Sequence, residues 1–243
     1  MILPLDLDAA SLLELGGTFD AGEYQRRLVR LANCLGFPLI SGAVLTADIR
    51  DPSVKIQSFG NTPPDYQAAA LDIDMARADP VMNHLMTSRA PMTYNRKVYH
   101  DAGLDMMWEH QAPYGYANGV ALKVPLSAGR SFVVGVDTGD ELPKDEQRLG
   151  EIVTGVQLIA FNASVAAEGI FHAHLQAELP RLTPKERSVM QWTLAGKTAW
   201  EIGRILSMSE NTVRYHTANV LKKANVSTKQ QAALKYSNAG LLG

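Results

Sequence analysis

The clearest chemical pattern in the sequence lies in residues 208–226, where donor side chains recur on one side of a predicted helix. Successive residues in an α-helix turn by about 100°. One face of this helix therefore carries Asn211, Arg214, Tyr215, Ala218 and Lys222. The face offers hydrogen-bond donors, an aromatic ring and a small residue, and we expect it to carry no carboxylate. An ordinary solvated surface would mix both signs of charge, so this face favours a polyanionic partner.

The opposite side of the same helix is predicted to pack inward. Its stripe consists of Val213, Thr217, Val220 and Ala224. Ser209 is the predicted N-cap, and the break "SMS" separates this helix from a shorter one at about residues 198–206. A short helix, a tight turn and a second helix with a donor-rich face are typical of a helix-turn-helix that binds DNA.

Two further helices complete a predicted all-α module of four. In "TPKE", Thr183 is the expected N-cap and Glu186 completes a capping box. Gly196 ends that first helix, because glycine readily adopts the left-handed conformation. Ser227 is expected to cap the fourth helix, which closes at Gly240.

Residues 182–242 resemble the LuxR-type helix-turn-helix regulators. The positions that match the family pattern are Glu186, Gly196, Glu201, Ile202, Thr212, Val213, His216, Asn219 and Lys222. Gly203 departs from the pattern, since alanine is usual there, at a cost in helix propensity of about 1 kcal/mol. The resemblance implies that residues 212–222 enter the major groove of double-stranded DNA.

The side chains of this module suggest separate roles at DNA. Arginine can form two hydrogen bonds to guanine, so Arg214 is predicted to recognise a base. Lysines hold phosphates without recognising sequence, and this role is predicted for Lys197, Lys222 and Lys223. The rest of the predicted DNA-binding set is Asn211, Thr212 and Tyr215.

The net charge of −2 hides a division between the two parts of the chain. Residues 178–243 hold 10 Lys and Arg against 4 Glu, whereas residues 1–177 hold 13 basic and 21 acidic residues. This asymmetry predicts a basic module joined to an acidic one, near Pro180 and Pro184. We therefore expect a ligand-binding domain at 1–170, a linker at 171–181 and the DNA-binding domain at 182–243.

Several classes of protein are disfavoured by composition. The single cysteine, Cys34, lies on an apolar helical stripe and excludes a disulfide within the chain. No uninterrupted apolar run approaches the roughly 18 residues that cross a bilayer, and the acidic start is unlike a secretory signal. His172 and His174 lie on different faces of a helix and offer no metal site. We expect a cytoplasmic protein without a membrane partner or a bound cofactor.

Helix and strand patterns alternate through the first 170 residues. Strands are predicted at 39–49, 53–60, 118–126 and 131–137, and helices at 23–36, 63–73, 78–86, 101–115 and 144–175. This order predicts the α+β class, with an α/β/α sandwich around an antiparallel sheet. A phosphorylated receiver domain would instead show a parallel βα repeat, which is not seen.

The stretches "YQAAALDIDMARADPVMNHLMTSRAPMTY" and "PYGYANGVALKVPL" resemble the autoinducer-binding domain of quorum-sensing LuxR regulators. In that family an acylated homoserine lactone lies between sheet and helices. A tryptophan donates to the lactone carbonyl, and an aspartate accepts from the amide N–H.

The resemblance assigns ligand-binding roles by position. Asp79 with Pro80 matches the aspartate–proline pair, Gly119 matches the pocket glycine, and Trp108 matches a lining aromatic residue. Three markers are changed. Tyr66 and Tyr94 replace two tryptophans, and Ala70 replaces a tyrosine.

Asp137 ends a predicted strand near a position where serine or threonine usually faces the ligand. It could face the cavity together with Asp79. Two buried carboxyl groups without a cationic or multi-donor partner would leave one of them protonated. Equally, Asp137 could belong to the exposed turn "DTGDELP".

The sequence thus predicts a regulator that binds an acyl-homoserine lactone or related molecule and, as a homodimer, a palindromic DNA site. RNA polymerase is a further candidate partner. The alternative is an orphan regulator without a ligand, or with a non-lactone ligand. An enzyme using Asp79 and Asp137 would lack a nucleophile with a paired base, so no catalytic residue is assigned. The stripe Ile152, Val156, Ile159 and Ala163 is a candidate for part of the dimer contact, and the alternative is that it packs in the core.

Overall fold

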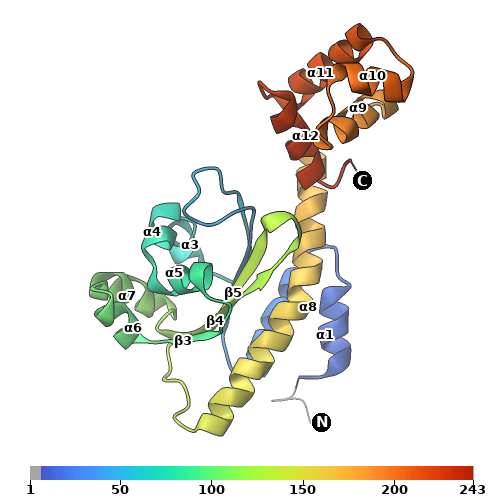
Figure 1. The fold of residues 1–243 in the computed structure, drawn as a ribbon. Helices are drawn as coiled ribbons and strands as arrows, with labels where there is room; N and C mark the ends of the chain where they lie inside the picture. The colour runs from blue at the N-terminus through green and yellow to red at the C-terminus, as the bar shows by residue number, and fades with distance from the viewer. Residues whose placement is uncertain (1–6, 243) are drawn as a thin grey trace. The chain divides into compact units, whose positions relative to one another are not determined.

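The chain divides into two compact units, Met1–Ile170 and Phe171–Gly243, and the computed structural model describes residues 7–242 of them (Figure 1). The first unit is a sheet with helices on both faces, and the second is all-helical. These observations confirm the predicted α+β class, the α/β/α sandwich of the first unit and the all-α module of the second.

The sheet of the first unit has five antiparallel strands in the order β2-β1-β5-β4-β3. The strands are β1 (Leu39–Leu45), β2 (Ile56–Gly60), β3 (Met92–Tyr94), β4 (Asn118–Pro125) and β5 (Ser131–Thr138). Tyr94 on β3 pairs with Gly119 on β4, and Gly119 pairs with Asp137 on β5. These three residues therefore form one row across the sheet.

Two helical layers cover this sheet (Figure 1). On one side lie α1 (Ala9–Gly16), α2 (Ala21–Cys34) and the first part of α8 (Glu146–Glu178). The other layer contains α3 (Gln67–Ala70), α4 (Ile73–Ala78), α5 (Pro80–Thr87), α6 (Arg96–Asp101) and α7 (Asp105–Gln111). Short 3-10 turns lie at Pro64–Tyr66, Ala112–Tyr114 and Ser127–Gly129. A core of Val81, Leu85 and Tyr99 against Leu45 and Val133 joins this second layer to the sheet.

The stripe that we considered for dimer contact lies in the core of the first unit. Ile152, Val156, Ile159 and Ala163 are all buried, and the Ala163 carbonyl accepts a hydrogen bond from the Tyr24 hydroxyl at 3.1 Å. The most apolar face of α8 packs inward because it has the most surface to remove from water. Of the two alternatives for this stripe, packing in the core is therefore the one that the structure bears out.

By length and composition alone α8 could cross a membrane, contrary to our sequence estimate. Such a helix is weak evidence for a membrane span, because the core helix of a soluble protein passes the same test. Val156, Ile159, Ala160 and Ala163 are fully buried against the protein itself.

The second unit contains α9 (Pro184–Leu194), α10 (Ala199–Leu206), α11 (Glu210–Ala224) and α12 (Lys229–Asn238). The predicted capping box is present, with Thr183 N donating to Glu186 at 2.8 Å and Glu186 N to Thr183 at 3.3 Å. Ser209 caps α11 as predicted. The cap of α12 is Thr228 rather than Ser227, because Thr228 and Gln231 form a capping box of their own.

The predicted linker at 171–181 is largely helical. Residues 171–178 continue α8, since no helix-breaking residue occurs before Pro180. Within the second unit, Gln176 Nε2 donates to the Ala239 carbonyl at 3.0 Å, and the Tyr236 hydroxyl donates to the Pro180 carbonyl at 2.8 Å. These residues thus belong to the second unit, and Leu179 lies in its hydrophobic core.

Candidate functional site

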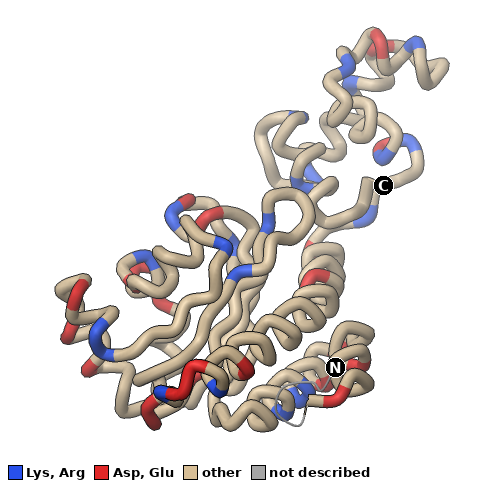
Figure 2. Tube along the Cα trace, turned by 60° about the horizontal axis from the view of Figure 1, so that its bottom comes forward, with Lys and Arg blue, Asp and Glu red and all other residues tan. Residues whose placement is uncertain are grey.

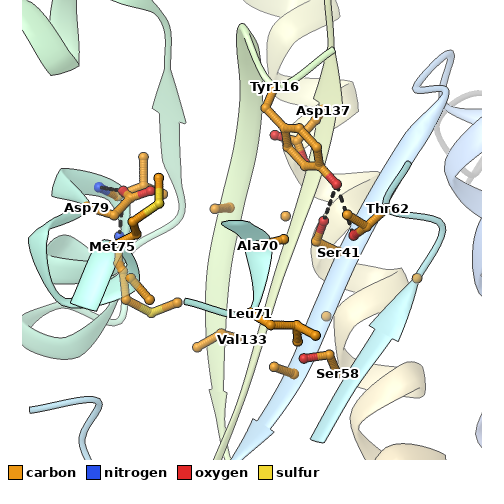
Figure 3. A pocket seen from close by; sticks show the side chains of 18 of the residues that line it. Ser41, Ser58, Thr62, Ala70, Leu71, Met75, Asp79, Tyr116, Val133 and Asp137 are labelled. Carbon is orange, nitrogen blue, oxygen red and sulfur yellow. Dashed lines mark hydrogen bonds between the residues drawn. The ribbon is translucent and has the colours of Figure 1, made fainter. Parts of the chain in front are cut away.

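The first unit contains a cavity of about 610 Å³ between the sheet and the helices α3 to α5 (Figure 3). This size is typical of sites for small organic molecules. Its apolar lining includes Ala43, Phe59, Leu71, Met75 and Val133. Its polar lining includes Ser41, Thr62, Tyr66, Asp79, Tyr94, Tyr116 and Asp137. The described lining residues include no lysine, arginine or histidine.

Asp137 faces this cavity and not an exposed turn. Its side chain is only 3% exposed, and its Oδ1 accepts a hydrogen bond from the Tyr94 hydroxyl. The row across the sheet explains how the two meet: Gly119 stands between them on β4 and has no side chain. A Cβ on Gly119 would lie 2.5 Å from the Tyr94 hydroxyl oxygen. Gly119 therefore makes room for Tyr94 and does not itself line the cavity.

The charge state of Asp137 is set by its burial. Removal from water raises the pKa of its carboxyl to about 7, the Tyr94 hydrogen bond opposes this rise, and the nearby Asp79 carboxylate adds to it. Near neutral pH this carboxyl is therefore poised between its acid and its charged form.

Asp79 lines the cavity and also caps α5. Its Oδ1 accepts from Val81 N at 2.6 Å and Met82 N at 3.3 Å, so the capping alternative is correct for this oxygen. Its Oδ2 accepts a long hydrogen bond of 3.4 Å from the Tyr99 hydroxyl. Burial raises the pKa of Asp79, although the two backbone bonds oppose the rise. Figure 3 shows Asp79 and Asp137 on different sides of the pocket, with Ala70 and Leu71 between them.

The three changed markers, Tyr66, Ala70 and Tyr94, all line the cavity. The Tyr66 ring stacks on Tyr114, with ring centroids 4.9 Å apart, and lies 5.0 Å from the ring of Tyr116. Burial raises the pKa of Tyr66 to about 12, so its hydroxyl stays protonated at neutral pH. This hydroxyl makes no hydrogen bond to a described residue and is available to a ligand.

Besides Gly119, two further predicted ligand residues do not line the cavity. Trp108 donates its indole N–H to the Ala117 carbonyl at 2.9 Å, and Arg96 lies over its ring. Pro80 is the first residue of α5 and fixes the start of that helix. Both residues shape the structure around the cavity without contacting its interior.

Sequence reasoning missed one polar corner of the cavity. The Tyr116 hydroxyl donates to Thr62 Oγ1 at 3.0 Å and lies 3.3 Å from Ser41 Oγ (Figure 3). Tyr116 lies in "PYGYANG", three residues before the predicted pocket glycine Gly119. This position could have indicated that Tyr116 lines the cavity. Nothing in the sequence indicated that Ser41 and Thr62 belong to the site. Ser41 lies on the distant β1, and Thr62 lies in the loop after β2.

The second unit presents the donor-rich face of α11 as predicted. Val213, Val220 and Ala224 are buried, whereas Thr217 is half-buried. The exposed residues are Asn211, Thr212, Arg214, Tyr215, Ala218 and Lys222. Figure 2 shows Lys and Arg outnumbering Asp and Glu along this unit.

The same face also carries a carboxylate, which corrects our expectation that it had none. Glu210 Oε1 lies 2.6 Å from Arg214 Nη2 and 3.1 Å from Arg214 Nε. The two residues are one helical turn apart, a spacing that brings such side chains together.

The three predicted phosphate-binding lysines differ in their surroundings. Lys222 is exposed and forms no ion pair with a described residue. Lys197 Nζ lies 3.8 Å from Glu201 on the surface. Lys223 instead lies 2.6 Å from the buried Glu186 and donates to the Arg181 carbonyl at 3.1 Å. These contacts show that Lys223 also stabilises the packing of the module, and its role at phosphate stays a prediction.

Gly203 fits the turn between α10 and α11. A Cβ at this residue would lie 2.7 Å from the Met208 carbonyl oxygen. Met208 N donates back to the Gly203 carbonyl at 2.9 Å, which closes the turn. Glycine at residue 203 lowers helix propensity, but it lets α10 approach the turn at Met208 more closely than a residue with a side chain could.

Family models match both parts of the chain. Residues 180–236 match bacterial regulatory proteins of the luxR family, and residues 20–163 match the autoinducer binding domain.

Two relatives match over nearly their whole length. The transcriptional activator protein SolR of Ralstonia solanacearum is 30% identical, covering 92% of this chain and 93% of SolR. The transcriptional activator protein AnoR of Acinetobacter nosocomialis is 26% identical, covering 87% of this chain and 88% of AnoR. A solved structure of SdiA in complex with octanoyl-rac-glycerol has the same fold, with a TM-score of 0.73 and 24% identity over 96% of this chain and 94% of that chain.

Proposed function

The chain belongs to the LuxR family of quorum-sensing transcriptional regulators, and we propose that a small molecule bound in the cavity of the first unit controls DNA binding by the second. The bound molecule is an acyl-homoserine lactone or a related amphiphile. The protein acts in the cytoplasm on promoter DNA.

The single observation that carries this proposal is the cavity itself. It joins a polar region around Tyr66, Tyr116 and Asp137 to an apolar region around Leu71 and Val133. A molecule with a polar head and an apolar tail would fill both regions, and burial of the tail would supply most of its binding energy.

The DNA-binding step rests on the exposed face of α11. Arg214 is the candidate for base recognition, with Asn211, Thr212 and Tyr215 beside it. Lys222 and Lys197 are the candidates for phosphate contact.

The proposed active form is a dimer on a palindromic site. One recognition helix contacts few bases, so two half-sites are needed for specificity. With the core stripe of α8 excluded, the candidate contact with a second copy is an exposed apolar patch formed by Leu13, Phe19, Phe161 and Val165. Phe19 packs beside Gly169 of α8, so the patch spans adjoining segments. Sedimentation of the DNA complex tests this step, and one protomer per site would contradict it.

A regulator with a non-lactone ligand is the second candidate. It is favoured by the altered residues Tyr66, Ala70 and Tyr94 and by the carboxyl of Asp137, all in the cavity lining. The SdiA structure supports it, because octanoyl-rac-glycerol is not a lactone.

One experiment tests the ligand proposal directly. The protein is produced with and without extracts of bacterial cultures, purified, denatured and analysed by mass spectrometry for released small molecules. A molecule released in a 1:1 ratio to protein is expected. Protein that stays ligand-free in every extract, yet binds promoter DNA fully, would contradict the proposal and favour an orphan regulator.

A further inference from the structure

One oxygen of Asp137 points to the chemistry of the molecule that fills the cavity. Oδ1 accepts the Tyr94 hydrogen bond, whereas Oδ2 makes no hydrogen bond to any described residue. The side chain is 97% buried and lines the cavity. Oδ2 is open to the cavity and is not among the fully buried unpartnered atoms of the described residues. A carboxylate in so enclosed a place is costly unless it is paired and hydrogen-bonded, so donors on a bound molecule would stabilise its charged form.

No positively charged side chain of the described residues lines the cavity beside this oxygen, because the described lining residues include no lysine, arginine or histidine. They include two further carboxyl groups, Asp72 and Asp79, and Asp79 raises the pKa of Asp137 through its negative charge. The other titratable groups near Asp137 are Tyr66, Tyr94, Tyr99 and Tyr116, whose pKa values are all raised by burial. These hydroxyls remain neutral donors and cannot compensate the charge.

We propose that the ligand carries a protonated amine or amidine, and that its N–H groups donate to Oδ2 of Asp137. This inference rests on the proposed function, because it names the chemical class of the ligand in the same cavity. The cation pairs with Asp137, the free Tyr66 hydroxyl lies in the same lining, and the apolar tail lies among Ala43, Leu71 and Val133.

An acylated homoserine lactone matches this site less well than a cation does. Such a lactone is neutral and has a single amide N–H, which cannot donate to both Asp79 and Oδ2 of Asp137. A neutral ligand would have to bind with Asp137 protonated. A cationic ligand supplies both the charge and several donors.

The two ligand classes give opposite dependence on pH. A cation needs Asp137 ionised, so its binding should strengthen from pH 6 to pH 8, across the pKa of about 7. A neutral ligand that accepts a hydrogen bond from the protonated carboxyl of Asp137 should bind better at pH 6. An alkylammonium stays protonated over this whole range, as a lysine side chain does.

The test uses three probes that share an eight-carbon chain and differ in the head group: octylammonium, 1-octanol and N-octanoyl homoserine lactone. Their affinities are measured by calorimetry on the full chain at pH 6 and pH 8. Octylammonium is expected to bind at least tenfold more tightly than octanol at pH 8, with a smaller preference at pH 6. Asp137→Asn should abolish the preference. The control is Asp140→Asn, which removes the same charge from an exposed residue three positions away.

Tyr94→Phe provides a second variant should Asp137→Asn unfold. It keeps the carboxyl but removes the hydrogen bond that lowers the pKa of Asp137. The preference for octylammonium should therefore persist, and its onset should move to higher pH. Equal binding of octylammonium and octanol by the parent protein would overturn the proposal, as would tighter binding of the lactone at pH 6. In those cases the regulator function would still stand, because a neutral probe that binds supports it. The function itself fails only when no culture extract alters DNA binding.

Discussion

Arg214 and Glu210 form an ion pair on α11, with Nη2 of the arginine 2.6 Å from Oε1 of the glutamate. The side chain best suited to recognise a base is therefore held by a carboxylate on its own helix. The pair occupies Nε and Nη2 of Arg214 and thus competes with DNA for these donors.

The first prediction is that Glu210→Gln strengthens DNA binding. The substitution releases Arg214 and removes a negative charge beside the phosphates, and exposed pairs of this kind contribute up to about 1 kcal/mol. Fluorescence anisotropy with a labelled duplex measures the change. Glu178→Gln is the charge control outside α11 and should have a smaller effect. Weaker binding by Glu210→Gln would show instead that Glu210 positions Arg214 for the DNA.

Arg214→Ala and Lys222→Ala should change DNA binding in different ways. Loss of Arg214 should cost roughly 1–3 kcal/mol and relax preference at one base position, whereas loss of Lys222 should weaken all sequences alike. Binding to the preferred duplex and to single-base variants of it separates the two. An Arg214→Ala protein that binds with unchanged affinity and preference would disprove the assignment to base recognition.

Much of the DNA-binding module follows from sequence, and much of the ligand site does not. Helix starts were predictable because local capping pairs such as Thr183 and Glu186 define them. Glu210 was missed because the face was counted from Asn211, one residue after the helix begins. The three-residue β3 is too short to show periodicity. The direction of Asp137 could not be decided, since β5 is buried on both faces and period-2 alternation is absent.

The family resemblance likewise did not predict where the side chain of Trp108 points. An aromatic residue at that position was expected to line the pocket, but its indole N–H bonds to the Ala117 carbonyl. A single backbone acceptor, invisible in the sequence, decides the direction of the ring. The cavity lining therefore had to come from the structure.

For Asp79, the cap and the proposed ligand contact can be separated by substitution. Asp79→Asn should keep the stability of the fold, because asparagine caps nearly as well, whereas Asp79→Ala should lose about 1 kcal/mol. If Oδ2 also serves the ligand, Asp79→Asn should weaken binding of octylammonium and of N-octanoyl homoserine lactone. Chemical denaturation and calorimetry measure the two effects. Unchanged probe affinity in a folded Asp79→Asn protein would leave Asp79 as a cap only.

The raised pKa of Asp137 predicts a dependence of stability on pH in the ligand-free protein. The folded pKa is about 7 and the ordinary value is 3.8. The folded state therefore binds the proton more strongly, and its stabilising effect is present below about pH 4 and lost as pH rises to 7. At about 1.4 kcal/mol per pKa unit, the loss is at most about 4 kcal/mol.

Denaturation of the parent and of Asp137→Asn between pH 5 and pH 8 measures this contribution. The parent should lose more stability than the variant over this interval, and Asp140→Asn should behave as the parent does. Identical pH profiles for the parent and Asp137→Asn would mean that Asp137 does not titrate in this range.

Control of DNA binding from the cavity is the central claim, and one equilibrium measurement tests it most directly. The DNA affinity of the full chain is measured with and without an active culture extract, on a duplex selected from a randomised pool. Ala70→Trp, which fills the cavity with a large ring, is the matched variant. The extract should change the affinity of the parent at least tenfold and leave Ala70→Trp unchanged. An extract that has no effect on the parent, or the same effect on both proteins, would contradict the account.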